Sequence, residues 1–396
     1  MTVDVPESLR QLFGGGVAET LGALRRDLHR HPELSWQEEA TAQRLMRALQ
    51  ELGITEVTRV ARTGLVARVP GRTRGGPAIA LRGDIDALPI TEATGLDFAS
   101  ETPGVMHACG HDVHASWAVG AAWLLLEKPA ERDVLVILQP AEELGEGAAA
   151  VLESGAIDGA QMIFGGHVDR RFDVGQVVAQ AGPLAASTDT FTIIVKGAGA
   201  HGARPHESHD PIVGAAALIG ALQTLVSRRL DPAEPGVVTV GTIVAGSASN
   251  IIPDRAELTG TIRATTPNAR TLLGSELRRM AESIAAAYDL TASVQLSAGT
   301  PPIVNPPQIA SAAREAVANV LGPNALVALP SMNMGGEDFA MYMERIPGCF
   351  MRIGAREPGG RAIPAHSPAF YAAEGALFVG AAVLAECARV GARTPY

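Results

Sequence analysis

The stretch Val134–Gly147 reads VLVILQPAEELGEG. Its first residues form a short apolar run rich in β-branched side chains, which is typical of a buried strand. Similar strand-like runs occur at Gly64–Val69, Ala78–Leu81 and Met162–Gly166. A helix-like apolar segment, Ala115–Glu127, lies among them. Because strands and helices alternate, the sequence predicts an α/β domain built on an open central sheet.

The pattern changes after Thr188, where strand-like and helix-like segments follow in the order β-α-β-β-α-β. The strands are TFTIIVKG, VVTVGTIVAG, ELTGTIRAT and Thr291–Leu296, and the helices are Pro211–Arg229 and Thr271–Tyr288. This order is that of a ferredoxin-like α+β domain. A chain of 396 residues also exceeds the ~250–300 at which one core stops growing. We therefore predict an inserted domain at 186–298 within a discontinuous metal-binding catalytic domain, 1–185 and 299–396.

Composition excludes several classes of partner. The net charge is -10 and no run of Lys or Arg could follow a phosphate backbone, so nucleic acid is excluded. Met1–Arg10 lacks the pattern of a secretory signal, and the longest apolar stretches, such as Phe378–Leu384, are shorter than the ~20 residues that span a bilayer. Three cysteines without close spacing suit a reducing compartment. The sequence thus predicts a cytoplasmic protein with no membrane partner.

The densest chemical motif is HACGHDVH, residues 107–114. Cys109 and His111 flank a glycine that lets the backbone aim both side chains at one point, and the N-terminus of the following helix is expected to lower the thiol pKa. A metal accepts such a pair, although a Cys109 nucleophile with a histidine base is the alternative. The nearby Asp112 and His114 favour metal binding over the nucleophile, because they can support metal ligands through hydrogen bonds.

Adjacent carboxylates follow the strand that ends at Gln139. Glu142 and Glu143 need different partners to remain charged together. If Glu143 binds a cation, Glu142 is left as a general base for a water molecule. An isolated pair of this kind is usually a solvated loop, but its position after a buried strand favours the catalytic interpretation.

Three further residues complete the candidate centre. His167 follows the strand Met162–Gly166, and Asp86 follows the strand ending near Leu81, where ligands of open α/β sheets collect. Asp86 is expected to hydrogen-bond a ligating imidazole and fix its tautomer. The last candidate ligand is His366, in AHSPAF.

Five ligands exceed the three protein ligands that one catalytic zinc normally takes. We therefore expect two divalent metal ions per subunit that share a ligand. Thiolate, imidazole and carboxylate ligands suit zinc, with manganese, cobalt and nickel as alternatives. Such a pair of metals supports amide or peptide hydrolysis.

Nine motifs stand in a characteristic order along the chain: RGDIDALP, HACGHDVH, QPAEELGEGA, GGHVD, KGAGAHGARPH, SASNIIPD, GTIRA, MGGEDF and AHSPAF. In this set the chain resembles the amidohydrolase branch of the aminoacylase/carboxypeptidase metallopeptidases, which includes hippurate hydrolases, indole-acetyl-amino-acid hydrolases and N-acetyl-diaminopimelate deacetylases. The resemblance implies a phosphorylase/hydrolase-like α/β catalytic domain and an inserted dimerisation (lid) domain.

The resemblance also implies roles for individual residues. The metal ligands would be Cys109, His111, Glu143, His167 and His366, with Glu142 as the base that activates water and protonates the leaving amine. His201 would stabilise the oxyanion in a partner subunit's site, and Asn250 and Arg263 would bind the substrate carboxylate. The implied substrate is a small N-acyl-L-amino acid or short peptide, and the implied assembly is a homodimer or tetramer formed through the inserted domain.

Three alternatives remain open. A dipeptidase or carboxypeptidase would use the same two metals on a peptide. A non-catalytic metal-dependent binding protein would be favoured by loss of Glu142 or of a ligand, but all six residues are present. A cysteine amidase using Cys109 would remain active after chelation and lose activity on thiol alkylation.

Overall fold

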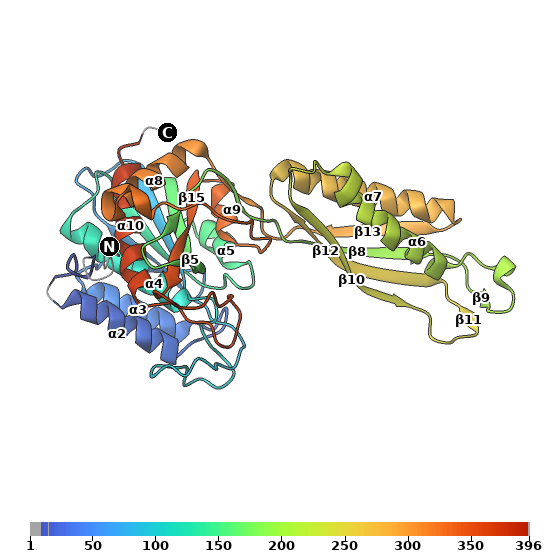
Figure 1. Ribbon diagram of the computed structural model, residues 1–396, viewed down its shortest axis with the longest axis horizontal. Coiled ribbons are helices and arrows are strands. Elements are labelled where there is room, and N and C mark those ends of the chain that lie inside the picture. The colour runs from blue at the N-terminus through green and yellow to red at the C-terminus, as the bar shows by residue number, and fades with distance from the viewer. Residues whose placement is uncertain (1–8, 15, 395–396) are drawn as a thin grey trace. The chain divides into compact units, whose positions relative to one another are not determined.

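The computed structural model describes residues 9–14 and 16–394. Most of Met1–Arg10, the segment predicted to carry no secretory signal, lies outside the described residues. The chain divides into two compact units (Figure 1). The first comprises Met1–Gly182, Asn305–Pro330 and Met341–Tyr396, and the second comprises Pro183–Val304 and Ser331–Ala340.

The first unit contains a seven-stranded mixed sheet with the strand order β1-β2-β4-β3-β5-β15-β6. Its four central strands, β4, β3, β5 and β15, are parallel to one another, whereas β1, β2 and β6 are antiparallel to their neighbours. The strands are β1 (Val57–Val60), β2 (Gly64–Val69), β3 (Ala78–Asp84), β4 (Val134–Gln139), β5 (Ala160–Asp173), β6 (Val177–Val178) and β15 (Gly348–Arg356). The predicted open central sheet is confirmed.

Helices of the first unit pack on this sheet. Helix α4 (His111–Glu127) contacts β3 and β4, and α10 (Gly375–Gly391) contacts β5 and β15 as well as α4. Helix α2 (Val17–Arg30) packs against α4. A Cβ atom at Gly380 of α10 would lie 2.1 Å from the ring of the fully buried Trp117, so glycine is required for the close approach of α10 to α4. The remaining helices of this unit are α3 (Glu39–Glu51), α5 (Gly147–Glu153) and α8 (Pro307–Leu321), and α9 (Phe339–Met343) spans the boundary between the two units in the chain.

The second unit has a four-stranded antiparallel sheet with the order β10-β12-β8-β13. In sequence its elements are β8 (Asp189–Lys196), α6 (Pro211–Thr224, continued by a π-helical turn Leu225–Arg229), β10 (Gly236–Ala245), β12 (Arg255–Ala264), α7 (Pro267–Ala287) and β13 (Thr291–Ser297). Helices α6 and α7 contact each other and pack on the sheet around a core of their own. This is the predicted ferredoxin-like arrangement, and the fold class is confirmed.

Small elements lie outside these two sheets. A two-stranded sheet pairs β9 (Ala200–His201) with β11 (Ile251–Ile252), and another pairs β7 (Gly182–Ala185) with β14 (Ile303–Asn305). Single turns of 3-10 helix span Pro205–Glu207 and Pro323–Ala325.

Three boundaries differ from the prediction. Helix α4 begins at His111 rather than near Ala115, because Gly110 adopts φ 89° and caps the helix directly before it. Strand β5 continues to Asp173, since it pairs with β15 as far as that residue, and His167 therefore lies within the strand. Ser331–Ala340 groups with the second unit, where Gly335 accepts a hydrogen bond from the Ala186 amide.

One helical stretch of the described chain, Pro211–Arg229, is long and apolar enough to cross a membrane by length and composition alone. Such a helix is weak evidence for a membrane span, because core helices meet the same criteria. The face formed by Ala215, Leu218 and Leu222 is buried in the core of the second unit. Its opposite face is largely exposed.

Candidate metal centre

The candidate ligands of the first unit come from segments that meet at one edge of its sheet. Cys109 precedes the glycine that caps α4, and His111 is the first residue of that helix. Glu142 and Glu143 follow β4, His167 lies on β5, and His366 lies in the loop between β15 and α10. In open α/β sheets, the carboxyl ends of parallel strands form the usual ligand site.

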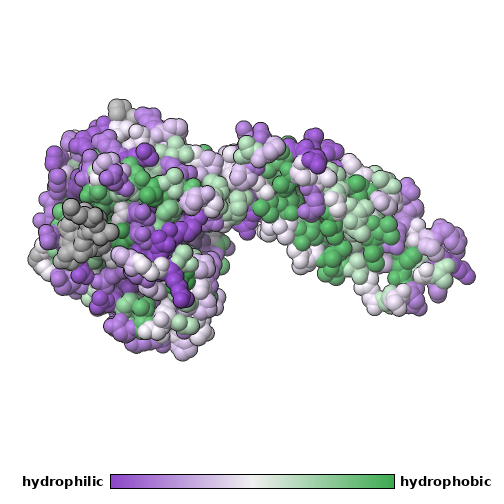
Figure 2. Space-filling model, viewed as in Figure 1, coloured by the Kyte–Doolittle hydropathy of each residue, from purple (hydrophilic) through white to green (hydrophobic). Residues whose placement is uncertain are grey.

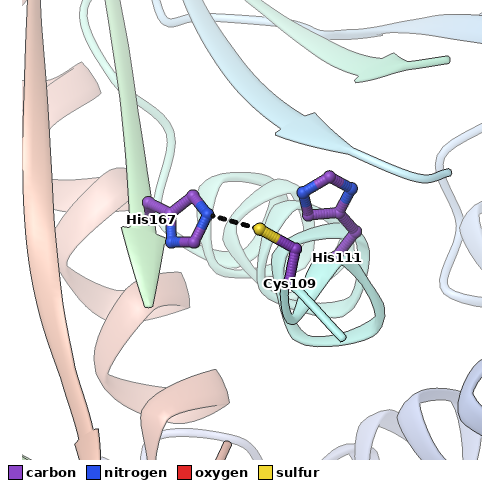
Figure 3. A group of neighbouring side chains, drawn as sticks. All are labelled: Cys109, His111 and His167. Carbon is purple, nitrogen blue, oxygen red and sulfur yellow. Dashed lines mark hydrogen bonds between the residues drawn. The ribbon is translucent and has the colours of Figure 1, made fainter. Parts of the chain in front are cut away.

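The side chains of these residues form overlapping groups. Ligand atoms of Cys109, His111 and His167 all lie within 4.8 Å of one another, and so do those of Cys109, Glu143 and His366. Figure 3 shows the first group, in which the Cys109 Sγ atom lies 3.1 Å from His167 Nε2. Cys109 belongs to both groups, which is the arrangement expected for two cations that share a ligand.

Two buried polar atoms are left without a hydrogen bond at the centre of this cluster. Nε2 of His111 and Oε1 of Glu143 are buried, face each other at 3.9 Å, and have no hydrogen-bond partner among the described residues. An unpaired buried polar group costs ~1–3 kcal/mol, so such atoms call for a partner. Imidazole, thiolate and carboxylate are ligands of divalent transition metals, and the residues therefore fit a pair of such ions.

Hydrogen bonds from outside the cluster orient its two buried imidazoles. Nδ1 of His111 lies 2.9 Å from the carbonyl oxygen and 3.1 Å from the Oδ1 atom of Asp86. Nδ1 of His167 lies 2.7 Å from the carbonyl oxygen of Val168. When each Nδ1–H donates to oxygen, the lone pair of Nε2 is directed into the cluster. Asp86 also accepts a 3.0 Å hydrogen bond from the Glu143 amide, so it links the two halves of the centre.

The charges around the cluster shift its pKa values. Burial opposes protonation of His111, but the nearby Asp84 and Asp86 carboxylates raise its pKa well above the ordinary value. Burial lowers the pKa of His167, which favours its neutral form. The pKa of Cys109 is raised, first by burial and then by Glu143. The expectation of a lowered thiol pKa was therefore wrong, because burial is the largest influence on this thiol and raises its pKa.

Asp112 and His114 lie behind the cluster in buried networks. Asp112 pairs with Arg25 at 2.8 Å and with His29 Nδ1 at 2.8 Å. His114 uses both ring nitrogens, since Nδ1 lies 2.6 Å from Asp84 Oδ1 and Nε2 accepts a hydrogen bond from the Val168 amide. These contacts hold the start of α4 against β3, β5 and α2.

Sequence reasoning missed two residues that support the centre. Ser35 donates a 2.7 Å hydrogen bond to Asp86, and the buried Glu38 accepts a 2.9 Å hydrogen bond from the Ala141 amide. Ala141 directly precedes Glu142 and adopts φ 51°, a left-handed conformation that costs a residue with a Cβ atom ~1–2 kcal/mol. Both residues lie in the segment between α2 and α3, which carries no cluster of metal-ligating residue types.

The other predicted site residues belong to the second unit. His201 is exposed on β9 opposite Ile251, and its Nδ1 accepts a hydrogen bond from the Ala203 amide at 3.0 Å. The carbonyl oxygen of Asn250 accepts a 2.8 Å hydrogen bond from the Gly202 amide, so His201 and Asn250 lie on neighbouring segments. Arg263 lies on β12, opposite Val237. Their roles stay predictions.

Comparison with known proteins identifies relatives over nearly the whole chain. Residues 80–390 match the sequence profile of peptidase family M20/M25/M40. The chain is 43% identical over 369 residues to an N-acetylcysteine deacetylase of Bacillus subtilis, covering 92% of this chain and 95% of the relative. It is 36% identical to thermostable carboxypeptidase 2 of Saccharolobus solfataricus, covering 90% of this chain and 92% of that protein.

The chain also resembles a solved structure over nearly its whole length. The chain superimposes with a TM-score of 0.84 and 38% identity on a Bacillus subtilis protein described as a dinuclear metal binding peptidase from the M20 family. The match covers 98% of this chain and 100% of that one.

Proposed function

The chain belongs to peptidase family M20/M25/M40, and we propose that this member hydrolyses the amide bond of N-acyl-L-amino acids. The family, its relatives and the candidate ligand groups make the protein a metal-dependent amidohydrolase with a two-metal centre. The observation that carries the proposal is the convergence of a thiol, imidazoles and a carboxylate around His111 Nε2 and Glu143 Oε1, two buried atoms that make no hydrogen bond to the described residues.

We propose that Cys109, His111, Glu143, His167 and His366 hold the two metals. When bound, a pair of divalent cations polarises a carbonyl group and lowers the pKa of water. The zinc ion is our first choice because the donor set combines thiolate, imidazole and carboxylate, and manganese, cobalt and nickel are the alternatives.

Glu142 is proposed as the general base. Its side chain is about 11% exposed, and its Oε2 lies 3.9 Å from His111 Nε2, at the rim of the cluster. A carboxylate in this position can take a proton from the attacking water and return it to the leaving amine. Hydrogen bonding of Ala141 to Glu38 holds the chain immediately before it.

Roles in substrate binding are proposed for three residues of the second unit. His201 would donate a hydrogen bond to the developing oxyanion, and Asn250 and Arg263 would bind the free carboxylate of the amino acid. His201 and Asn250 lie on neighbouring segments, which supports the proposal that both contact the same substrate molecule.

We further propose that two copies of the chain associate through the second unit. Strand β10 is an edge strand of its sheet, and it exposes Ile243 (48%) and Val244 (68%), while helix α6 exposes Ile212 and Val213 (50%). Figure 2 shows hydrophobic surface gathered on this unit. An exposed edge strand with apolar neighbours is a template for pairing with another strand, and a second copy would cover it.

The second candidate is carboxypeptidase activity at the same centre. It is favoured by the similarity to a protein named thermostable carboxypeptidase. The cysteine amidase is disfavoured, because without a metal burial and Glu143 raise the thiol pKa of Cys109 and so oppose formation of a nucleophilic thiolate. A bound cation would deprotonate the same thiol, as the metal centre requires. We place the protein in the cytoplasm, in keeping with its three free, buried cysteines.

Substrate profiling tests the proposal. Release of free amino acid is measured with N-acetyl, N-benzoyl and indole-acetyl amino acids and with dipeptides. We expect faster cleavage of at least one acyl-amino acid series than of the dipeptides. Preference for the dipeptides would favour the carboxypeptidase alternative, and no cleavage of any acyl-amino acid would refute the proposed substrate class.

A further inference from the structure

The candidate ligand His366 has an unusual setting. It lies in the segment between the end of β15 at Arg356 and the start of α10 at Gly375, which contains neither helix nor strand. Its side chain is about 54% exposed, whereas that of Glu143 is about 10% exposed. Its φ of 66° is left-handed, and its amide donates a 2.8 Å hydrogen bond to the Ala108 carbonyl. This ligand therefore depends on how its loop is held.

A buried arginine holds both ends of that loop. Arg170 lies on β5, three residues after His167, and its side chain is about 1% exposed. Its guanidinium donates hydrogen bonds to four residues at the start, within and at the end of the segment that carries His366. They are Ala355 (carbonyl oxygen, 3.2 Å), Glu357 (Oε2, 2.8 Å, and Oε1, 3.1 Å), Arg361 (carbonyl oxygen, 2.8 and 3.1 Å) and Tyr371 (carbonyl oxygen, 3.1 Å).

Glu357 and Tyr371 also bond to each other, and together with Arg170 they form what we call the clamp. The Tyr371 hydroxyl donates a 2.6 Å hydrogen bond to Glu357 Oε1, and the guanidinium carbon of Arg170 lies 4.3 Å from the centre of the Tyr371 ring. Partial burial acts to raise the pKa of Glu357, but hydrogen bonds from Arg170 and Tyr371 hold it at about 2. The carboxylate is thus ionised at neutral pH and forms a charge-assisted, bidentate pair with Arg170.

We propose that Arg170 is a positioning residue for His366: by joining Glu357 to Tyr371 it closes the loop 357–371 and holds this ligand opposite Glu143 and Cys109. The inference rests on the proposed metal centre. Without Arg170 the loop would be held by fewer contacts, chiefly the backbone hydrogen bonds of the His366 amide to Ala108 and of the Ala93 amide to Pro368. Binding a metal through His366 would then cost more ordering of the loop. The clamp supplies that order in advance.

The proposal predicts an effect confined to one of the two metals. His366 groups with Cys109 and Glu143, whereas His167 groups with Cys109 and His111. Loss of the clamp should therefore weaken the metal bound through His366 and leave the other one nearly unchanged. Loss of a residue that orients a ligand from outside typically lowers metal affinity ~10–100-fold. A purely structural arginine would affect both sites together or neither.

The test uses metal-free full-length protein titrated with zinc and, separately, with manganese, by calorimetry and by competition with a chromophoric chelator. The variants are Arg170→Gln, which removes the clamp, and Tyr371→Phe, which removes only the hydroxyl bond to Glu357. The matched control is Arg171→Gln, because Arg171 is the next residue on the same strand and pairs with Asp169 instead. Thermal unfolding of the metal-free proteins checks that each variant is folded.

We expect Arg170→Gln to show one weakened site of two, Tyr371→Phe a smaller loss at the same site, and Arg171→Gln two sites of wild-type affinity. Two wild-type affinities in Arg170→Gln, or equal weakening of both sites, would overturn the inference. If Arg170→Gln does not fold, Tyr371→Phe decides between these outcomes alone. The readout needs no substrate, so inactive protein that still binds two metals would count against the proposed function and not against the clamp.

Discussion

His111 Nε2 and Glu143 Oε1 face each other across 3.9 Å, both buried and both without a hydrogen-bond partner in the described part of the chain. One belongs to the first turn of α4 and the other to the loop after β4, so the sheet brings together residues that are 32 positions apart in sequence. The hydrogen bonds of Asp86 to both residues fix this relationship. The proposed metal centre rests chiefly on this pair of atoms.

Replacement of the general base should separate metal binding from catalysis. We expect Glu142→Ala to retain two bound metals, because the five proposed ligands remain, and to lose ~10²–10⁴-fold in kcat. Metal content is measured by elemental analysis and kcat with the best substrate of the panel. Turnover close to that of the wild type would refute the assigned base.

Replacement of the proposed oxyanion donor should act mainly on the transition state. We expect His201→Ala to lower kcat by ~10²–10³-fold with a smaller change in KM. The side chain is exposed on β9, so the fold should be unaffected, and circular dichroism provides the control. An effect on KM alone would assign His201 to ground-state binding instead.

The exposed apolar face of the second unit should control association. We expect wild-type protein to sediment as a dimer or larger assembly, and the double variant Val213→Asp with Val244→Asp to sediment as a monomer, because a buried charge disrupts an apolar interface. Leu12→Asp is the matched control, since Leu12 is a similarly exposed apolar side chain of the first unit. A monomeric wild type, or a dimeric double variant, would contradict the proposed interface.

Removal of the Glu38 carboxylate should destabilise the loop that carries the general base. We expect Glu38→Ala to lower the free energy of unfolding by ~1–3 kcal/mol, because it leaves the Ala141 amide and the Thr63 hydroxyl without their acceptor, and to lower kcat as well. Glu39→Ala is the control, since the adjacent Glu39 is exposed and pairs at the surface with Arg59. Such a pair contributes only ~0–1 kcal/mol. Urea unfolding measures both variants, and equal effects would argue against a special role of Glu38.

Much of the fold could be predicted because its signals are local. The alternation of strand-like and helix-like segments predicted both units, and the β-α-β-β-α-β order predicted the topology of the second. Helix α10 was not predicted, because it is apolar on most sides and its sequence alone does not separate a buried helix from a buried strand. The length of β5 was missed, because its last residues are polar and are held in the strand by β15.

The site residues likewise fall into those that could be predicted from the sequence and those that could not. Histidines and carboxylates beside glycines and strand ends could be found by type and position, and their convergence at one edge follows from the parallel strands. Ser35, Glu38 and Arg170 could not be found in this way, because their roles come from partners 51, 103 and 187 residues distant. The direction of the Cys109 pKa shift was wrong because the degree of burial cannot be read from the motif alone.

The most direct test of a metal-dependent amidohydrolase is hydrolysis of the best acyl-amino acid by one protein sample before chelation, after chelation, and after addition of zinc, manganese, cobalt or nickel. We predict loss of activity on chelation and its recovery with at least one of these ions, at about two equivalents per chain. Activity that persists in the fully metal-free protein, and that is abolished by alkylation of Cys109, would contradict the account and identify a cysteine amidase instead.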